Sequence, residues 1–356
     1  MLHEGSQIQK TQALPNRILP AKKDVLMEDD QKKKDEKKAS AARLSVVSNS
    51  TLVLLKLAVG LAIGSVSVIS EAIHSGVDLL AAVIAWFAVK TSGKPADHDH
   101  PFGHGKIENI SGTVEALLIF LAACGIIFDA AKKLMNPRPL EEPVLGVAVM
   151  MVSAVANVLI SGMLFKVGKE TDSVALQADA WHLRTDVYTS AGVMAALGVI
   201  WLGGVLFPDA DLKLVDPLVA IGVALLIFKA AYKLTVESGR GLMDVSLPPD
   251  EEEKIRKCIE AFAPTVRGFH RFRTRKSGSY RFVEFHARVD KSMSIGESHR
   301  ITDMITLSIK ECLPGTVVTI HIEPCNCTLA TEESCGCLLD EDELKAVRMK
   351  NEDNME

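Results

Sequence analysis

The chain has 356 residues, of which 48% are hydrophobic and 24% charged, and its formal net charge is −5. Its mean hydropathy of +0.19 is compatible with that charged fraction only if the charges are segregated. Most of them lie in the first 43 residues and after residue 238, whereas residues 44–238 are apolar, which predicts a membrane domain with water-facing ends. The basic residues are not interleaved with aromatic ones, so we expect no nucleic acid as a partner.

Residues 1–42 are polar and contain the mixed charge run KKDVLMEDDQKKKDEKK. This composition predicts a solvated, disordered tail, and a helical part next to the membrane stays open. The opening stretch MLHEGSQIQK lacks the basic residues and the apolar core of a cleavable signal peptide, so we expect the first span to act as the insertion signal.

Residues 43–238 contain six apolar segments, and each is long enough to cross about 30 Å of hydrocarbon as a helix that rises about 1.5 Å per residue. The spans are predicted near 43–66, 67–91, 108–132, 144–167, 174–203 and 213–236. Lysine and arginine are concentrated in the N-terminal tail, after the second and fourth segments and after the sixth. The positive-inside rule therefore predicts that both termini face the cytoplasm.

The C-terminal part changes character after a linker expected at 239–250. Helical spacing of apolar residues marks EEEKIRKCIEAF and SHRITDMITLSIKECL, whereas RGFHRFRTRKSG, RFVEFHARVD and TVVTIHIEP alternate like strands. This order, within residues 251–325, predicts a small α+β domain with both helices on one face of a short sheet. Residues 326–356 are predicted to be a polar, cysteine-containing tail.

Two histidine–aspartate pairs lie inside predicted spans, where ionisable groups are costly and usually functional. His74 and Asp78 are four residues apart and share a helix face, and His182 and Asp186 repeat the spacing in the fifth segment. Two imidazoles and two carboxylates suit a tetrahedral zinc ion. A single pair could be a polar contact between helices, but two identical pairs in separate spans favour a metal site.

Two further histidine groups lie outside the predicted spans. The loop after the second segment carries Asp97, His98, Asp99, His100 and His104 within PADHDHPFGHGK, which indicates a metal site or a solvated turn. The small domain carries His270, His286, His299, His321 and Glu323. Alternation places His321 and Glu323 on one strand face and His286 on the polar face of its strand, which favours a metal site over a merely solvated surface.

The four tail cysteines could form a thiolate site for zinc or a softer ion, or simply a reduced, flexible tail. They are Cys325, Cys327, Cys335 and Cys337. The pattern of the seven cysteines does not predict a disulfide framework. The predicted spans also contain Glu71, Glu115, Asp179 and Arg184, which could form helix–helix contacts or line a cavity.

HSGVD, PADHDHPFGHGKIE and ADAWHLRTDV together resemble the cation diffusion facilitator family of metal transporters, and the resemblance extends from about Ser45 to Cys325. It implies a homodimer in the lipid bilayer, six transmembrane helices per protomer and a cytoplasmic α+β domain with a metallochaperone-like, ferredoxin-like fold. It also implies export of a divalent cation from the cytoplasm in exchange for protons, by alternating access and without enzymatic activity or an organic cofactor.

The resemblance also implies roles for individual residues. The transport site would be His74, Asp78, His182 and Asp186, and the interfacial loop site would be Asp97, His100 and His104. His270, His286, His299 and His321 would belong to the metal cluster of the cytoplasmic domain, which would sense metal. Glu323 stands where the family has an aspartate, and its longer side chain changes the geometry of that ligand.

The transport-site ligands favour Zn²⁺, would also accept Fe²⁺, Co²⁺ or Cd²⁺, and are less suited to Mn²⁺. Metal binding requires deprotonated ligands, which couples the ion to protons. One rival is a membrane metalloprotease, but the sequence has no H-E-x-x-H motif. Another is a non-transporting metal sensor or partner subunit on the same fold. The compact loops, without a long His-rich loop between the fourth and fifth spans, favour a bacterial inner membrane.

Overall fold

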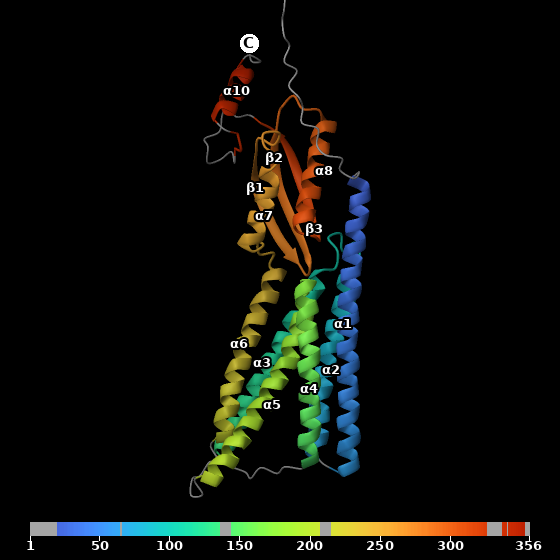
Figure 1. Cartoon of the computed structure of the whole chain (residues 1–356), viewed down its shortest axis with the longest axis vertical. Coiled ribbons are helices and arrows are strands. Elements are labelled where there is room, and N and C mark those ends of the chain that lie inside the picture. Colours follow the sequence, from blue (N-terminus) through green and yellow to red (C-terminus); the bar gives the residue numbers. More distant parts are fainter. Residues whose placement is uncertain are drawn as a thin grey trace, which may run out of the picture.

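The computed structural model describes residues 20–64, 66–135, 144–206, 215–325, 337–339 and 341–352. Six long helices form the membrane part of the molecule (Figure 1). They are α1 (Pro20–Ile63), α2 (Val66–Ser92), α3 (Lys106–Met135), α4 (Val144–Glu170), α5 (Val174–Leu206) and α6 (Val215–Leu242). Their order and positions match the six predicted apolar segments.

Five of these helices are long and apolar enough to cross a membrane: α1, α2, α3, α4 and α6. The remaining predicted span, α5, does not meet that criterion among the described residues. Its first part carries Asp179, Arg184 and Asp186, whereas residues 187–206 contain no charged side chain.

The C-terminal part folds as the predicted α+β unit, which we call the terminal domain. It comprises α7 (Pro249–Glu260), β1 (Gly268–Ser277), β2 (Tyr280–Val289), α8 (Ile295–Cys312) and β3 (Thr316–Pro324). The sheet order is β1-β2-β3, with β1 antiparallel and β3 parallel to β2. Beyond it, α10 (Glu341–Glu352) follows, and Gly268 forms an isolated bridge with Cys337.

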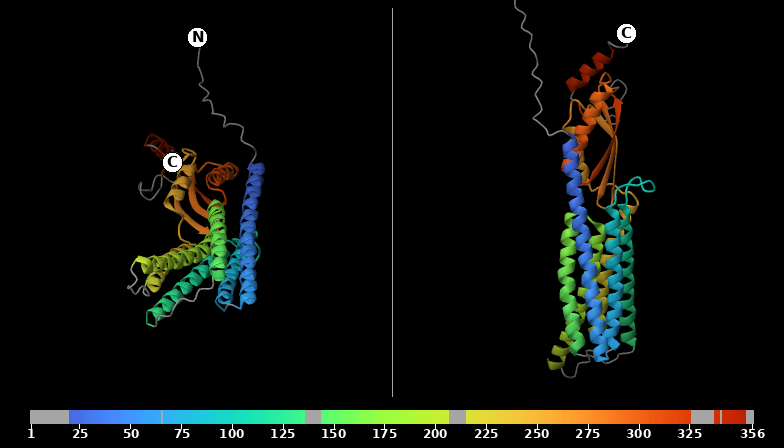
Figure 2. Two further views of the ribbon diagram at one scale, coloured as in Figure 1. Left: turned by 60° about the horizontal axis from the view of Figure 1, so that its bottom comes forward. Right: turned by 90° about the vertical axis from the view of Figure 1, so that its right-hand side faces the viewer.

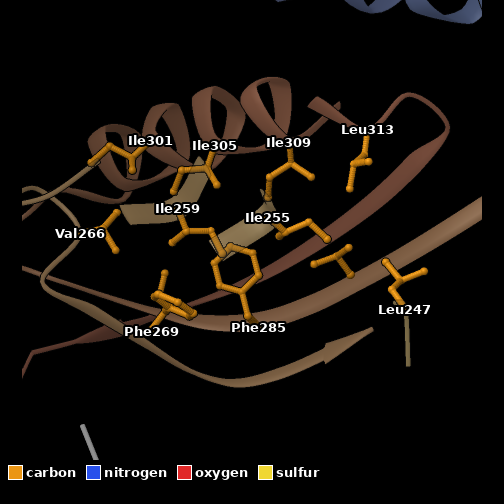
Figure 3. Close-up of a cluster of buried hydrophobic side chains, with 12 residues drawn as sticks. Leu247, Ile255, Ile259, Val266, Phe269, Phe285, Ile301, Ile305, Ile309 and Leu313 are labelled. Carbon is orange, nitrogen blue, oxygen red and sulfur yellow. The ribbon is translucent and has the colours of Figure 1, made fainter. Parts of the chain in front are cut away.

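One apolar core holds α7 and α8 against the same face of this sheet (Figure 3). Ile255 and Ile259 of α7 and Ile305 of α8 are fully buried, and Phe285 of β2 is 1% exposed. A capping box at Ser294 fixes the start of α8. The opposite face of the sheet is left free for polar side chains, as the alternation predicts.

The hairpin between β1 and β2 docks onto the membrane helices through a set of contacts that we call the junction. Lys38 of α1 is fully buried, and its Nζ lies 3.1 Å from Glu108 Oε1 and 2.8 Å from Ser279 Oγ. The Gly278 N–H donates to Asn109 Oδ1 at 2.8 Å. The junction therefore ties the terminal domain to α1 and α3 with buried, charge-assisted hydrogen bonds.

Two glycines allow the hairpin to approach this closely. Gly278 has a φ of 58°, which favours glycine. A Cβ added to Gly105 would lie 2.3 Å from the Ser277 carbonyl oxygen. Any side chain at Gly105 would therefore push the hairpin away from the membrane helices.

The N-terminal part of α1 extends past the membrane helices and runs beside the terminal domain (Figure 2). The disordered tail expected at residues 1–42 is therefore helical from Pro20 onward, and residues 1–19 lie outside the described residues. Its polar side chains have partners: Tyr280 Oη donates to Asp35 Oδ2 at 3.4 Å, and Lys37 Nζ lies 2.5 Å from Glu170 Oε2. These contacts hold the charged run in a helix against the rest of the molecule, which its composition alone does not predict.

Candidate metal centres

The membrane site lies between α2 and α5. Ligand atoms of His74, Asp78 and Asp186 all lie within 4.8 Å of one another. They line a cavity of about 160 Å³ that also touches α1 and α4. The four-residue helical spacing brings His74 and Asp78 to one face, and α5 supplies Asp186 to the same cavity. Three of the four predicted transport-site residues thus form one potential metal centre.

The fourth predicted residue, His182, is buried beside this group. Its Nε2 lies 3.1 Å from Asp78 Oδ1, and its Nδ1 has no hydrogen-bond partner among the described residues. Asp186 Oδ2 accepts a weak hydrogen bond from Asn157 Nδ2 at 3.4 Å. In this geometry His182 binds a carboxylate of the site and could bind an ion together with it.

A lysine also lines the cavity, and the sequence reasoning missed it. Lys56 of α1 is buried, donates to Ser75 Oγ at 2.7 Å and lies 3.5 Å from Glu71 Oε2. Glu71, one of the ionisable residues left open above, lines the same cavity. A lysine within an apolar segment is costly, and that cost was the signal that could have identified Lys56.

The other ionisable groups of the membrane part occupy different surroundings. Glu115 and Asp179 are fully buried, and Glu115 Oε2 and both Asp179 carboxylate oxygens have no hydrogen-bond partner among the described residues. The Arg184 guanidinium lies 4.9 Å from the centre of the Phe165 ring, a cation–π contact. None of these three belongs to a described cluster of metal-ligating side chains.

The loop site forms within the connection from α2 to α3. Ligand atoms of Asp97, His100 and His104 lie within 4.8 Å of one another. Asp97 Oδ1 accepts from the His100 N–H at 2.7 Å, and Asp97 Oδ2 lies 3.2 Å from His104 Nε2. The backbone hydrogen bond from His100 is the largest cause that lowers the pKa of Asp97. The exposed neighbours His98 and Asp99 pair with each other at 3.4 Å and stand outside the cluster.

The terminal cluster spans all three strands. His270, His286 and His321 are in register across the sheet, with ring centroids 5.2 Å and 4.6 Å apart. Ligand atoms of His270, His286 and Glu323 lie within 4.8 Å of one another. His321 Nε2 lies 3.9 Å from Glu323 Oε1. Strand register, not proximity in sequence, therefore assembles this cluster.

Glu323 is at the centre of the cluster. Its Oε1 lies 2.7 Å from His286 Nδ1, and its Oε2 lies 3.4 Å from His270 Nε2. The hydrogen bond to His286 is the main cause that lowers the pKa of Glu323, whereas burial lowers the pKa of His270. Glutamate thus reaches its histidine neighbours from the position at which the family resemblance expects aspartate.

His299 is not part of this cluster within the chain. It lies on α8 with its side chain 75% exposed, and its Nε2 is 3.8 Å from Asp303 of the same helix. The predicted tail site is not assembled among the described residues either. Cys325 is disulfide-bonded, which differs from the expected thiol, and Cys337 is free. Cys327 and Cys335 lie outside the described residues.

Comparison with known proteins finds two matching families. Residues 42–243 match the cation efflux transmembrane domain, and residues 247–325 match the cation efflux protein cytoplasmic domain. An uncharacterized transporter from Synechocystis, sll1263, is 37% identical over 73% of this chain and 82% of its own length. The cation-efflux pump FieF of Citrobacter koseri is 30% identical over 80% of this chain and 92% of its own.

Two solved structures are similar to part of the chain. The zinc form of the putative zinc transporter CzrB is 34% identical, covers 22% of this chain and 90% of its own, and has a TM-score of 0.22. The metal-bound C-terminal domain of the CzcD transporter from Thermotoga maritima is also 34% identical, with 21% and 87% coverage and a TM-score of 0.20.

Proposed function

Because the chain belongs to the cation diffusion facilitator family of cation efflux transporters, we propose that it exports Zn²⁺ from the cytoplasm in exchange for protons. The transport site would be His74, Asp78, His182 and Asp186. The observation that carries the proposal is that His74, Asp78 and Asp186 line one cavity inside the membrane part, with His182 hydrogen-bonded to Asp78 beside them. Buried ionisable groups at such a depth need a cation or protons to offset their charge.

The mixed ligand set supports zinc as the cargo. Two imidazoles and two carboxylates provide the number and type of donors that tetrahedral Zn²⁺ prefers. Fe²⁺, Co²⁺ and Cd²⁺ accept similar donors, and Fe²⁺ is the first alternative. Mn²⁺ favours oxygen-rich surroundings and is a weaker candidate.

The contact between His182 and Asp78 suggests how protons and metal exchange. A hydrogen must lie between Nε2 and Oδ1 for their 3.1 Å contact to be a hydrogen bond. Zn²⁺ binds the deprotonated atoms, so its arrival at both ligands displaces this hydrogen. When the cavity opens to the other side of the membrane, protons return to these atoms and release the ion.

The terminal cluster would serve regulation rather than passage. It lies on the sheet of the terminal domain, while the junction links that domain to α1 and α3. We propose that cytoplasmic metal binds His270, His286, His321 and Glu323, and that the chain works as a homodimer whose terminal domains approach each other on binding. His299, which is exposed, would then be available to complete the coordination. The proposed setting is a bacterial inner membrane with both termini in the cytoplasm.

The test is ion flux into proteoliposomes that contain a Zn²⁺-sensitive dye, with and without an imposed pH gradient. We expect gradient-driven Zn²⁺ uptake by the wild type and none by Asp186→Ala. The matched control Asp250→Ala removes an exposed carboxylate of α7 and should transport normally. Zinc uptake that ignores the pH gradient would contradict proton exchange. If no Zn²⁺ flux is observed, the same assay would be repeated with Fe²⁺ and Mn²⁺. No flux of these ions either would favour a non-transporting metal sensor.

A further inference from the structure

Two cysteines meet on the face of the terminal domain opposite the terminal cluster. Cys258 lies on α7 and Cys312 is the last residue of α8, and these helices pack side by side on the sheet. Their Sγ atoms are 2.7 Å apart. Cys258 is half-buried against the apolar core, whereas Cys312 is exposed. The two residues are 54 positions apart in sequence, so the fold itself creates this pair.

The separation of the sulfur atoms distinguishes two uses of such a pair. Two thiolates on one zinc ion stand about 3.8 Å apart, because each Zn–S bond is about 2.3 Å at a tetrahedral angle. Disulfide sulfurs are about 2.05 Å apart. The observed 2.7 Å is closer to the second value, so the geometry favours a covalent bond between the sulfurs over a shared metal ion.

We propose that Cys258 and Cys312 are a redox-sensitive disulfide site that joins α7 to α8 when a low-molecular-weight disulfide, such as oxidised glutathione, is present. This site is separate from the proposed transport function and does not depend on it.

The reaction is a double thiol–disulfide exchange. The Cys312 thiolate attacks one sulfur of oxidised glutathione, and the first glutathione leaves as a thiolate. Cys258 then loses its proton and attacks the Cys312 sulfur, and the second glutathione leaves. The two cysteines give up two electrons, oxidised glutathione takes them up, and the two cysteine protons neutralise the two glutathione thiolates.

Exposure and acidity set the order of these steps. The exposed Cys312 is the sulfur that an oxidant reaches first. Burial, together with the neighbouring Cys312 thiol, raises the pKa of Cys258 to about 11, so Cys258 is protonated at neutral pH. It is therefore suited to react second, with a sulfur that is already held beside it.

The bond would close a loop that contains β1, β2 and α8. It would fix the two helices that support the sheet carrying His270 and His286. A cross-link of this kind restricts the unfolded chain, so we expect the unfolding midpoint of the terminal domain to rise by about 5–15 °C.

The test uses the full chain in detergent, equilibrated at several ratios of reduced to oxidised glutathione, then alkylated and mapped by mass spectrometry. We expect the alkylatable thiols of Cys258 and Cys312 to disappear together and a peptide linking the two to appear. In Cys258→Ser, Cys312 should instead carry one glutathione. Cys124 of α3, which is free, is the internal control and should remain alkylatable.

Thermal unfolding provides the second measurement. Oxidation should raise the midpoint in the wild type and leave it unchanged in Cys258→Ser and Cys312→Ser. The proposal is overturned if both cysteines stay alkylatable under oxidising conditions, if each takes up glutathione separately, or if the cross-link forms without changing the midpoint.

Discussion

The membrane site and the terminal cluster use the same kinds of side chain but assemble them differently. In the membrane site, two helices each contribute a histidine and an aspartate four residues apart. In the terminal cluster, three strands each contribute one histidine, and Glu323 joins them from β3. The first arrangement follows from local helical spacing and includes the buried Asp78 and His182, whereas the second depends on strand register and is partly open to solvent.

This difference suggests different tasks. A site in a small cavity within the membrane part would suit selection and passage of an ion. A half-exposed cluster equilibrates freely with surrounding metal, which suits sensing. The junction lies between them, with a fully buried Lys38 and Glu108, and is the place where one region can influence the other.

The largest effect is expected from Asp78→Asn in the membrane site. This change replaces a carboxylate ligand by a neutral amide and removes the negative charge beside His182, so Zn²⁺ flux should fall at least about 100-fold. Proteoliposome uptake measures it, and Asp303→Asn on α8 is a matched control outside the membrane part. Near-normal flux in Asp78→Asn would contradict the assignment of ion passage to the membrane site and of sensing to the terminal cluster.

The next effect concerns the junction. Lys38→Met leaves the buried Glu108 without its cation, which should lower the free energy of unfolding by about 3–5 kcal/mol. The adjacent Lys37→Met removes only an exposed pair with Glu170 and should cost less than about 1 kcal/mol. Denaturant unfolding compares them, and equal losses would show that the junction is not a stabilising contact.

A smaller effect is expected at the start of the terminal domain. Glu251 accepts from Arg281 Nε at 2.8 Å and Nη2 at 2.7 Å, and these hydrogen bonds lower the pKa of Glu251. Because the folded-state pKa is lowered, the stabilisation is present above the ordinary glutamate pKa and is lost as pH falls through the folded value. Glu251→Gln should therefore cost about 1–3 kcal/mol at pH 7 and progressively less in acid.

The matched control for this pH series is Glu253→Gln on the same helix. Glu253 has an exposed side chain, and its Oε1 lies 3.4 Å from Lys257 Nζ one turn away, a contact worth at most about 0.5 kcal/mol. Unfolding of both variants should be followed between pH 7 and pH 3. A Glu251→Gln defect that stays constant across this range would contradict the assigned cause.

The smallest effect is expected from His286→Ala in the terminal cluster. It removes the closest partner of Glu323, so activation of transport should require roughly tenfold more metal while the maximal flux is retained. His299→Ala, outside the cluster within one chain, should change activation less in a monomeric preparation than in a dimer. An unchanged activation curve in His286→Ala would argue against a sensing role.

The sequence predicted most of the membrane site because its information is local. Helical spacing places His74 above Asp78 without knowledge of the fold, and apolar surroundings mark the pair as unusual. The sequence pattern did not identify Lys56 as a site residue because its partners, Glu71 and Ser75, lie on another helix. Its partners are decided by how α1 packs against α2, and the residue spacing within α1 carries no information about that packing.

In the terminal domain, the sequence predicted the elements but not which side chains meet. Alternation correctly assigned its strands and the polar face of β3, but which histidines meet is decided by register between strands that are distant in sequence. His299 therefore looked equivalent to His286 although α8 carries it away from the sheet. The sequence left a helix before the first span open for a similar reason, since the partner of Tyr280 is Asp35, 245 residues earlier.

Proton release on Zn²⁺ binding tests the central claim most directly. The full chain in detergent is titrated with Zn²⁺ by calorimetry in two buffers of different protonation enthalpy, for the wild type and Asp186→Ala. Because the loop and terminal clusters are present in both, the difference between them reports the membrane site. The account predicts that the wild type binds an additional ion and releases additional protons with it. An additional ion bound without proton release would contradict exchange at His74, Asp78, His182 and Asp186.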